Sequence, residues 1–236
     1  LSLSGNNTYT GDTTINAGTL EIQSGDALGS TVGETIINTN AKLTISGGIT
    51  TAENITNVGG GSGKITGGAG GGTFTGLITL TNSIDLRGND LTFSGGVTSL
   101  DQRFGINGQR YVIDTTAIDL DSDNSGGAGS FGVTSAGNNE ANATQLNIGG
   151  NDWGVTNINF GGYLKLGGSD FMPTDTDVLF GFTQWRYSDG TLNLAGNDQT
   201  VRSLATNSNS LGLGGNQTVT GESGAVLTVN LDSDTK

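Results

Sequence analysis

The side chains best suited to chemistry in this chain are carboxylates, and three of them alternate along one short segment. Asp119, Asp121 and Asp123 lie in the stretch DLDSDNSGG. Carboxylate oxygens are preferred ligands of Ca²⁺. An EF-hand loop also needs Gly at its sixth position and Glu at its twelfth, where this chain has Asn124 and Ser130. Two interpretations remain open, a looser calcium site at the three aspartates and a hydrated loop.

Paired carboxylates are also the groups that cleave sugars, since glycoside hydrolases need only two Asp or Glu side chains. The chain offers six candidate aspartates for this role, and each of them also fits a solvated turn, in which an Asp side chain hydrogen-bonds the backbone. We favour the turn and keep a polysaccharide lyase or hydrolase as an alternative. The chain has no His and no Cys, which excludes Ser-His-Asp and Cys-His catalysis and the usual zinc sites. The candidate carboxylates are Asp119, Asp121, Asp123, Asp170, Asp175 and Asp177.

Aromatic residues next to a basic residue occur in one segment, FTQWRYSD. We predict Trp185, Arg186 and Tyr187 as contacts for a glycan or another partner. Three aromatic residues that come earlier in the chain could also stack on sugars, but we favour their packing within the fold. These are Trp153, Phe160 and Tyr163.

A glycine-rich segment, GGGSGKITGG, is loosely similar to a phosphate-binding loop. That motif needs a Gly five positions before its Gly-Lys pair and a Ser or Thr directly after the Lys. Val58 and Ile65 stand at those positions around Lys64. We therefore predict no nucleotide site here.

The composition describes an acidic chain with little material for a core. Its net charge is −13 with nine basic residues, which argues against nucleic acid and anionic membranes as partners. Only 32% of residues are hydrophobic and 43 are glycines, so a thin, elongated fold is expected rather than a globule. No stretch has the length and apolarity of a membrane helix.

Two-residue alternation predicts many short strands, each followed by Gly, Asn, Asp or Ser. Strands this short, at a spacing of about 20 residues, are typical of a repeat architecture. We predict an all-β, right-handed parallel β-helix (β-solenoid) of roughly twelve coils, forming a single elongated domain over residues 1–236. Residues 101–150 are expected to form less regular coils with a loop excursion. The strands are expected within Leu1–Gly5, Gly18–Gln23, Ala41–Gly47, Gly76–Leu80, Asp90–Gly95, Gly162–Gly168, Gly190–Gly196 and Val226–Leu231.

An internal similarity supports a repeat. Leu20 and Ile22 align with Leu164 and Leu166 at an offset of 144 residues, and Tyr9 aligns with Trp153 at the same offset. We expect Tyr9 to point inward, and Asn and Thr residues of successive coils to form side-chain ladders.

The opening stretch, LSLSGNNTYTGDTTINAGTLEIQSGDALGS (Leu1–Ser30), closely resembles the autotransporter-associated β-strand repeat of type V secreted passenger domains and giant bacterial surface proteins. Asn151–Phe180 is similar to the same unit, and Gly190–Ala205 and Gly215–Asn230 are similar to segments that follow it. The resemblance implies a right-handed β-helix outside the cell that acts as a stalk or adhesive shaft. Its motif residues are structural, so it implies no catalytic residue.

These features favour a non-catalytic, extracellular structural β-helix on a bacterial surface, serving adhesion, aggregation or as a stalk. The expected partners are a host or neighbouring-cell surface, a glycan or the chain itself, with no membrane insertion by this segment. The chain is expected to be a fragment or a processed product. The main alternative is a subunit of an extracellular filament or sheath that stacks head to tail, because solenoid ends expose unpaired strand edges. No cofactor other than calcium is considered.

Overall fold

The computed structural model describes residues 1–120, 129–134, 139–181, 189–206 and 215–231. The chain is all-β, as predicted: these residues form 24 strands and one short 3₁₀ helix, η1 (Glu140–Asn142). Among them there is no α-helix, and hence no helix that could span a membrane. The strands predicted at the start and near the end of the chain are both present, as β1 (Ser2–Leu3) and β24 (Leu227–Val229).

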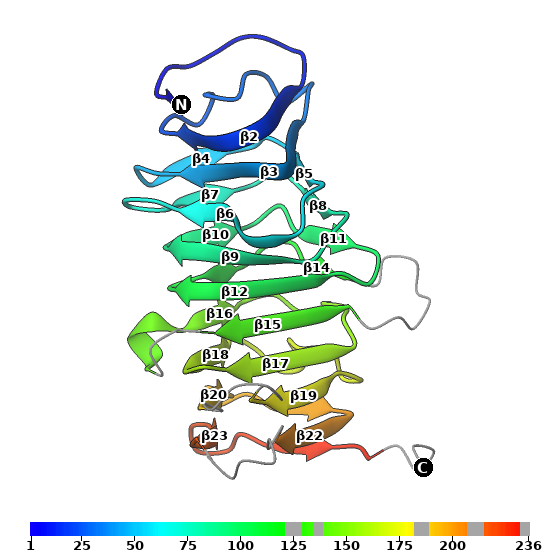
Figure 1. Cartoon of the computed structure of the whole chain (residues 1–236). Coiled ribbons are helices and arrows are strands. Elements are labelled where there is room, and N and C mark those ends of the chain that lie inside the picture. Colours follow the sequence, from blue (N-terminus) through cyan, green and yellow to red (C-terminus); the bar gives the residue numbers. More distant parts are fainter. Residues whose placement is uncertain (121–128, 135–138, 182–188, 207–214, 232–236) are drawn as a thin grey trace.

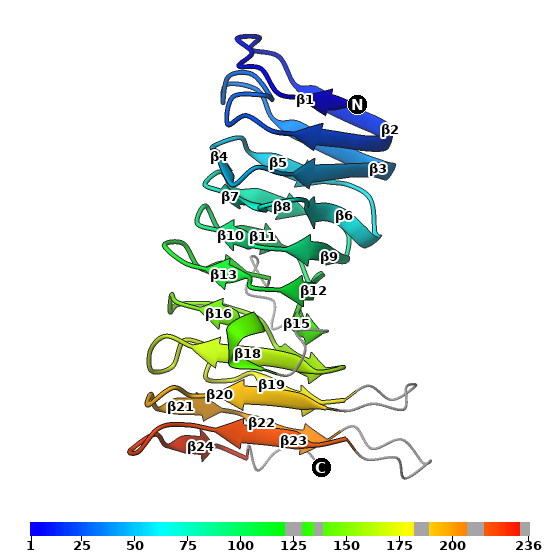
Figure 2. The ribbon, with the colours of Figure 1, turned by 90° about the vertical axis from the view of Figure 1, so that its left-hand side faces the viewer.

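The strands stack in columns, each strand pairing in parallel with the strand one turn away (Figures 1 and 2). Two long strands, β2 (Thr13–Ile22) and β3 (Thr35–Ile45), span the first two columns together. The first column continues with β5 (Ile55–Asn57), β8 (Ile78–Leu80), β11 (Val97–Ser99) and β14 (Ile118–Asp119). The second contains β1, β6 (Gly61–Gly67), β9 (Ile84–Asn89), β12 (Arg103–Gln109), β15 (Ser130–Thr134), β17 (Val155–Asn159), β19 (Asp177–Phe180) and β22 (Ser203–Thr206). The third contains β4 (Ile49–Thr51), β7 (Gly72–Phe74), β10 (Leu91–Phe93), β13 (Val112–Ile113), β16 (Thr144–Leu146), β18 (Gly162–Leu166), β20 (Gly190–Asn193) and β23 (Gln217–Thr220). A short fourth column pairs β21 (Gln199–Val201) with β24.

The fold is therefore the predicted β-solenoid. In Figure 1 the chain crosses the front from right to left as it descends from the N-terminus, which is the right-handed sense. Sheets built this way need no long apolar strands, because each strand adds only one or two inward side chains.

The predicted number of coils was too high. The third column holds eight strands among the described residues, not twelve. The turns are unequal, because Gly72 pairs with Leu91 whereas Val112 pairs with the much more distant Gln145. Several turns are therefore longer than the repeat length on which the prediction was based.

Unequal turns also correct the meaning of the 144-residue offset. Leu20 lies on β2 and belongs to the second column, but its aligned partner Leu164 lies on β18 in the third column. The two similar segments therefore occupy different sides of the solenoid. The aromatic pair differs as well: Trp153 is 1% exposed, whereas Tyr9 is 40% exposed and does not point inward as predicted.

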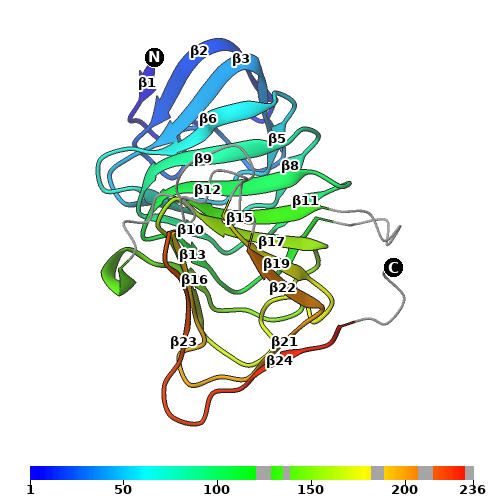
Figure 3. The same ribbon diagram turned by 60° about the horizontal axis from the view of Figure 1, so that its bottom comes forward.

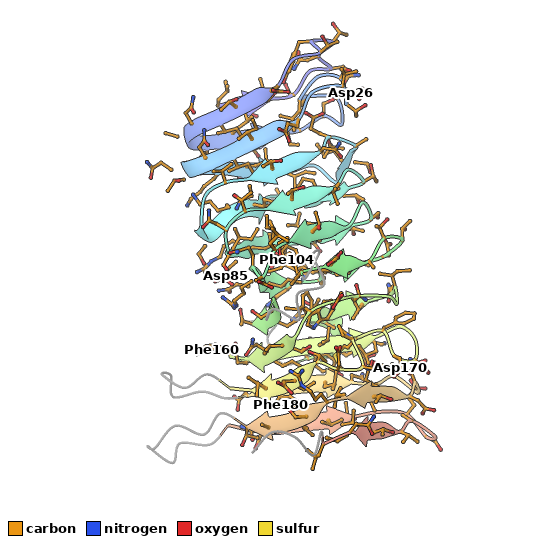
Figure 4. All side chains as sticks on the ribbon, turned by 90° about the vertical axis from the view of Figure 1, so that its right-hand side faces the viewer. Asp26, Asp85, Phe104, Phe160, Asp170 and Phe180 are labelled. Atoms are coloured by element: carbon orange, nitrogen blue, oxygen red, sulfur yellow. The ribbon has the colours of Figure 1, made fainter. Side chains whose placement is uncertain are left out.

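The core is one continuous cluster of aliphatic side chains from all the columns, with an aromatic stack at mid-length. Phe93 stacks on Phe74 and on Tyr111, with ring centroids 5.6 and 6.4 Å apart, and meets Phe104 edge-on. Phe131 continues the stack between Phe104 and Trp153. Phe104 and Phe180 lie within the ribbon in Figure 4, whereas Asp85 lies at its edge. Buried aromatic rings thus share the core of the middle turns with aliphatic residues.

Side-chain ladders join some successive turns, as predicted. Asn38 Nδ2 donates to Asn16 Oδ1 at 2.8 Å, and the Thr156 and Thr176 hydroxyls hydrogen-bond each other at 3.0 Å. Both links join positions one turn apart, so they stabilise the stack without a ligand.

Candidate functional site

The predicted calcium segment is only partly described. Asp119 ends β14, where it lies in register with Thr98 and bridges to Asp152 one turn on. Asp121 and Asp123 lie outside the described residues. Within the part of the chain that the structure describes, no three His, Cys, Asp or Glu side chains are grouped so that they could hold a metal. The calcium site stays a prediction.

Two of the carboxylates considered for sugar cleavage, Asp170 and Asp177, are hydrogen-bonded to the next turn. Asp177 accepts two hydrogen bonds from Arg202, at 2.9 and 2.7 Å, and one from Ser203 Oγ at 2.6 Å. The bonds from Arg202 lower the pKa of Asp177, with Ser203 adding to the effect, so this carboxyl stays ionised and is poorly suited to donate a proton. Asp170 accepts from the Thr200 amide at 2.7 Å. Asp175 is exposed.

The aromatic residues considered for sugar stacking are largely buried. Trp153 lies in the core and donates its indole N–H to Thr156 Oγ1 at 2.7 Å. Tyr163 is buried against Ala143, and its hydroxyl accepts from Asn193 at 3.0 Å. Phe160 is half-buried at the corner between β17 and β18, with φ 51°. Trp185, Arg186 and Tyr187 lie outside the described residues, so the glycan contact stays a prediction.

One outer face, which the sequence did not predict, carries a row of threonines with exposed apolar neighbours. On β5, β8 and β11 the outward residues Thr56, Thr79 and Thr98 lie in register. Val58, Leu77 and Leu100 flank them and are exposed. We call these six residues the threonine face. The segments 54–58, 77–81 and 96–100 contain no charged residue, and carboxylates lie at the two ends of the row, where Thr56 Oγ1 donates to Glu34 Oε2 at 2.7 Å and Asp119 lies in register with Thr98. The signal was the recurring pattern apolar-Thr-x in ITN, ITL and VTS, which marks an outward Thr between two inward residues.

The neighbouring face of the second column carries charge. Arg103 Nη1 lies 2.7 Å from Asp85 Oδ1 across the turn between β12 and β9. Glycines form the floor beneath this pair: a Cβ on Gly105 would lie 1.8 Å from Asp85 Oδ1, and one on Gly132 would lie 3.1 Å from Arg103 Nη2. The two glycines therefore let the ion pair lie flat on the sheet.

The last described turn exposes its inward side chains. Leu204 on β22, Val219 on β23 and Val229 on β24 are in register with the buried Val178, Leu192 and Val201 of the turn before. All three are more than a third exposed. Figure 3 shows the three strands on three sides of this end. Leu204 and Val219, but not Val229, line a hollow of about 400 Å³, whose lining is Phe180, Leu204, Ala205, Thr206, Gln217 and Val219.

Comparison with known families finds one match, at the N-terminus. Residues 1–22 match the family described as passenger-associated-transport-repeat. The repeat and the solenoid fit an autotransporter passenger repeat protein. No curated protein and no solved structure matches the chain.

The passenger repeat spans β1 and β2, and the geometry explains its residues. Ser2 and Leu3 pair with Glu21 and Ile22, so the repeat closes one turn on itself. Its apolar residues Ile15, Leu20 and Ile22 are buried, while its glycine Gly18 adopts φ 76°, which favours glycine. The repeat's residues thus serve the fold. A passenger repeat is typical of secreted or surface-displayed proteins.

Proposed function

We propose that this chain is a non-catalytic, surface-displayed shaft that spaces or joins cells outside the bacterium. The observation that carries the proposal is the passenger repeat at the start of an uninterrupted parallel stack. Backbone hydrogen bonds between turns run along the shaft, so pulling or proteolysis at one turn is resisted by its neighbours.

Surface display is tested on intact producing cells. Antibodies raised against the purified chain should label these cells without permeabilisation, and added protease should remove the label. Labelling that requires lysis would contradict a surface role.

For the joining role, we place the contact between two copies at their threonine faces. Copies with a net charge of −13 repel each other. Approach is least opposed where charged side chains are few, and the six residues of the threonine face are uncharged and include three exposed apolar side chains. Side-by-side contact there would bury Val58, Leu77 and Leu100.

The double variant Leu77→Asp, Leu100→Asp should reduce aggregation of displaying cells, because both positions are exposed and the new charges would repel. Thr73→Asp and Thr92→Asp on the third column form the matched control, since both are half-buried outward positions on another side. Equal aggregation by both double variants would show that the threonine face is not the contact.

A second candidate is a filament made by head-to-tail stacking of copies. The observation that favours it is the hollow lined by exposed Leu204 and Val219, with exposed Val229 at the same end of the stack. β22 and β1 lie at opposite ends of the same column, so a second copy placed end to end would continue that column. Exposed Leu1 and the inward Leu204 would then come close together.

Electron microscopy and the variant Leu204→Asp separate the two modes of association. Filaments of wild-type chain that are lost in Leu204→Asp but kept in Leu77→Asp, Leu100→Asp would favour end stacking. Monodisperse short rods of wild-type chain would end the filament hypothesis. Turnover on acidic or neutral glycans that is lost in Asp175→Asn would instead support a polysaccharide-active enzyme.

A further inference from the structure

The glycine-rich segment that loosely resembles a phosphate loop has its lysine turned into the fold. Lys64 lies on β6 and is only 5% exposed. Its Nζ donates to the backbone carbonyls of Asn38 at 3.4 Å and Ala41 at 3.3 Å, and also to that of Thr39. A lysine ammonium carries three donors, so all of them are used on main-chain oxygens.

These carbonyls belong to the place where the sheet forks. On its edge that faces the following turn, β3 pairs with two strands. It pairs with β5 through Thr35–Ile37 and with β6 through Leu43–Ile45. Between the two branches, residues 38–42 have no ladder partner on that side among the described strands. Ala41 is buried, Asn38 is half-buried and Thr39 is exposed. A buried carbonyl that lacks a strand partner needs another donor, and Lys64 supplies one to Ala41 while also bonding the other two carbonyls.

Two glycines position the ammonium, Gly59 by leaving it room and Gly63 through its backbone conformation. A Cβ on Gly59 would lie 2.6 Å from Thr39 Cα and 2.9 Å from Lys64 Nζ. Gly63 adopts φ 73° within the register shift between Ser62 and Thr66, and this bulge turns the next residue, Lys64, inward. The spacing of glycines and lysine that suggested a phosphate loop is thus required by the backbone.

We propose that Gly59–Lys64 and the carbonyls of Asn38, Thr39 and Ala41 form an internal ammonium site that holds the fork between the broad sheet of β2–β3 and the three-sided shaft. The chemical class of ligand is a primary ammonium, here supplied by the chain itself. Burial lowers the pKa of Lys64, and the charge of Lys42 adds to this effect. The inference does not depend on the proposed function.

The wild-type protein allows a direct test by NMR. In chain labelled with ¹⁵N-lysine, an ammonium held by three carbonyls should give a slowly exchanging NH₃⁺ signal near neutral pH. The signal should vanish in Lys64→Met and persist in Lys42→Ala, whose side chain is exposed. Absence of the signal from wild-type chain, or its survival in Lys64→Met, would overturn the proposal.

A rescue experiment tests the ligand class. Lys64→Ala should lower the thermal midpoint of unfolding by roughly 4–10 °C, the size expected for losing charged hydrogen bonds in a chain of this length. Propylammonium should restore part of that loss in Lys64→Ala and leave both wild type and Lys64→Met unchanged. Equal shifts in all three proteins, or no shift in Lys64→Ala, would contradict an ammonium site; if Lys64→Ala does not fold, the NMR result decides.

Discussion

Glu53 brings a carboxyl group into the interior next to other acidic residues. It is 3% exposed, and Thr35 Oγ1 donates to its Oε1 at 3.4 Å. Burial raises the pKa of Glu53 above 4.5, the bond from Thr35 opposes the rise, and the charges of Asp12 and Glu34 add to it. The ionised form therefore costs folding free energy at neutral pH.

The variant Glu53→Gln should stabilise the protein at pH 7 by on the order of 1 kcal/mol, because it removes a buried charge and keeps the length of the side chain. In wild type the stability should rise as pH falls through the raised pKa of Glu53, and this rise should end near the unfolded value of 4.5. Denaturant unfolding between pH 4 and pH 8 measures both effects. A wild-type and a Glu53→Gln curve of identical pH dependence would contradict the assignment.

The types of residue in the chain predicted which chemistry is excluded better than they predicted which side chains are exposed. The absence of His and Cys removes two classes of site whatever the fold. Whether an aromatic residue packs or is exposed depends on its place in the turn: Trp153 stacks on Phe131, whereas Tyr9 is partly exposed and hydrogen-bonds Thr13. Sequence similarity alone equated the two residues.

At the level of elements, β10 is the centre of the aromatic stack. Phe93 contacts rings from β7, β12 and the residue before β13, so it joins three successive turns through side chains as well as through the backbone.

Phe93→Ala should lower the free energy of unfolding by about 3–5 kcal/mol, because it leaves a cavity between three rings. Thr92→Ala, the outward neighbour on the same strand, is the matched control and should cost far less. Urea unfolding of both variants checks this. A loss in Phe93→Ala no larger than that of the control would show that the stack contributes little.

The flat ion pair of Arg103 and Asp85 also depends on an element, the glycine floor of β12 and β15. Gly132→Ala should displace the guanidinium and weaken the pair, with a small effect on stability of about 0–1 kcal/mol because the pair lies partly exposed on the outer face. Asn157→Ala, one turn further on in the same row, serves as control. Comparing the salt dependence of unfolding in the two variants measures the change; equal salt dependence would show that Gly132 does not support the pair.

The sequence predicted well where strands lie along the chain, and poorly which strands pair with one another. Alternation placed residues such as Leu43 and Leu192 correctly, because an inward side chain and its outward neighbour follow from a period of two. Which column a strand joins depends on the lengths of the corners and loops. These lengths vary so widely that the 144-residue offset aligned residues that lie in different columns. The threonine face was missed for the same reason, since it exists only once β5, β8 and β11 are in register.

For the molecule as a whole, each turn contacts chiefly the turns above and below it. Stability in such a stack is close to a sum of local terms, so damage should stay local.

Leu43→Ala, in the core of β3, should therefore increase amide hydrogen exchange in β2, β3 and β6 and leave β18 and β20 unchanged. Leu164→Ala, in the core of β18, should give the converse pattern. Hydrogen exchange followed by mass spectrometry resolves these regions. Equal loss of protection along the whole chain in both variants would mean that the solenoid unfolds as one cooperative unit.

The unequal turns have a consequence under load. A turn peeled from the stack releases its own length of chain, at about 3.3–3.6 Å per residue. Because the turn between β13 and β16 is much longer than the turn between β7 and β10, single steps would lengthen the molecule by roughly 60–120 Å. The longest step belongs to the turn between β13 and β16. If the chain is the surface shaft proposed above, it would yield to pulling in steps of graded size and dissipate the force over several ruptures instead of one.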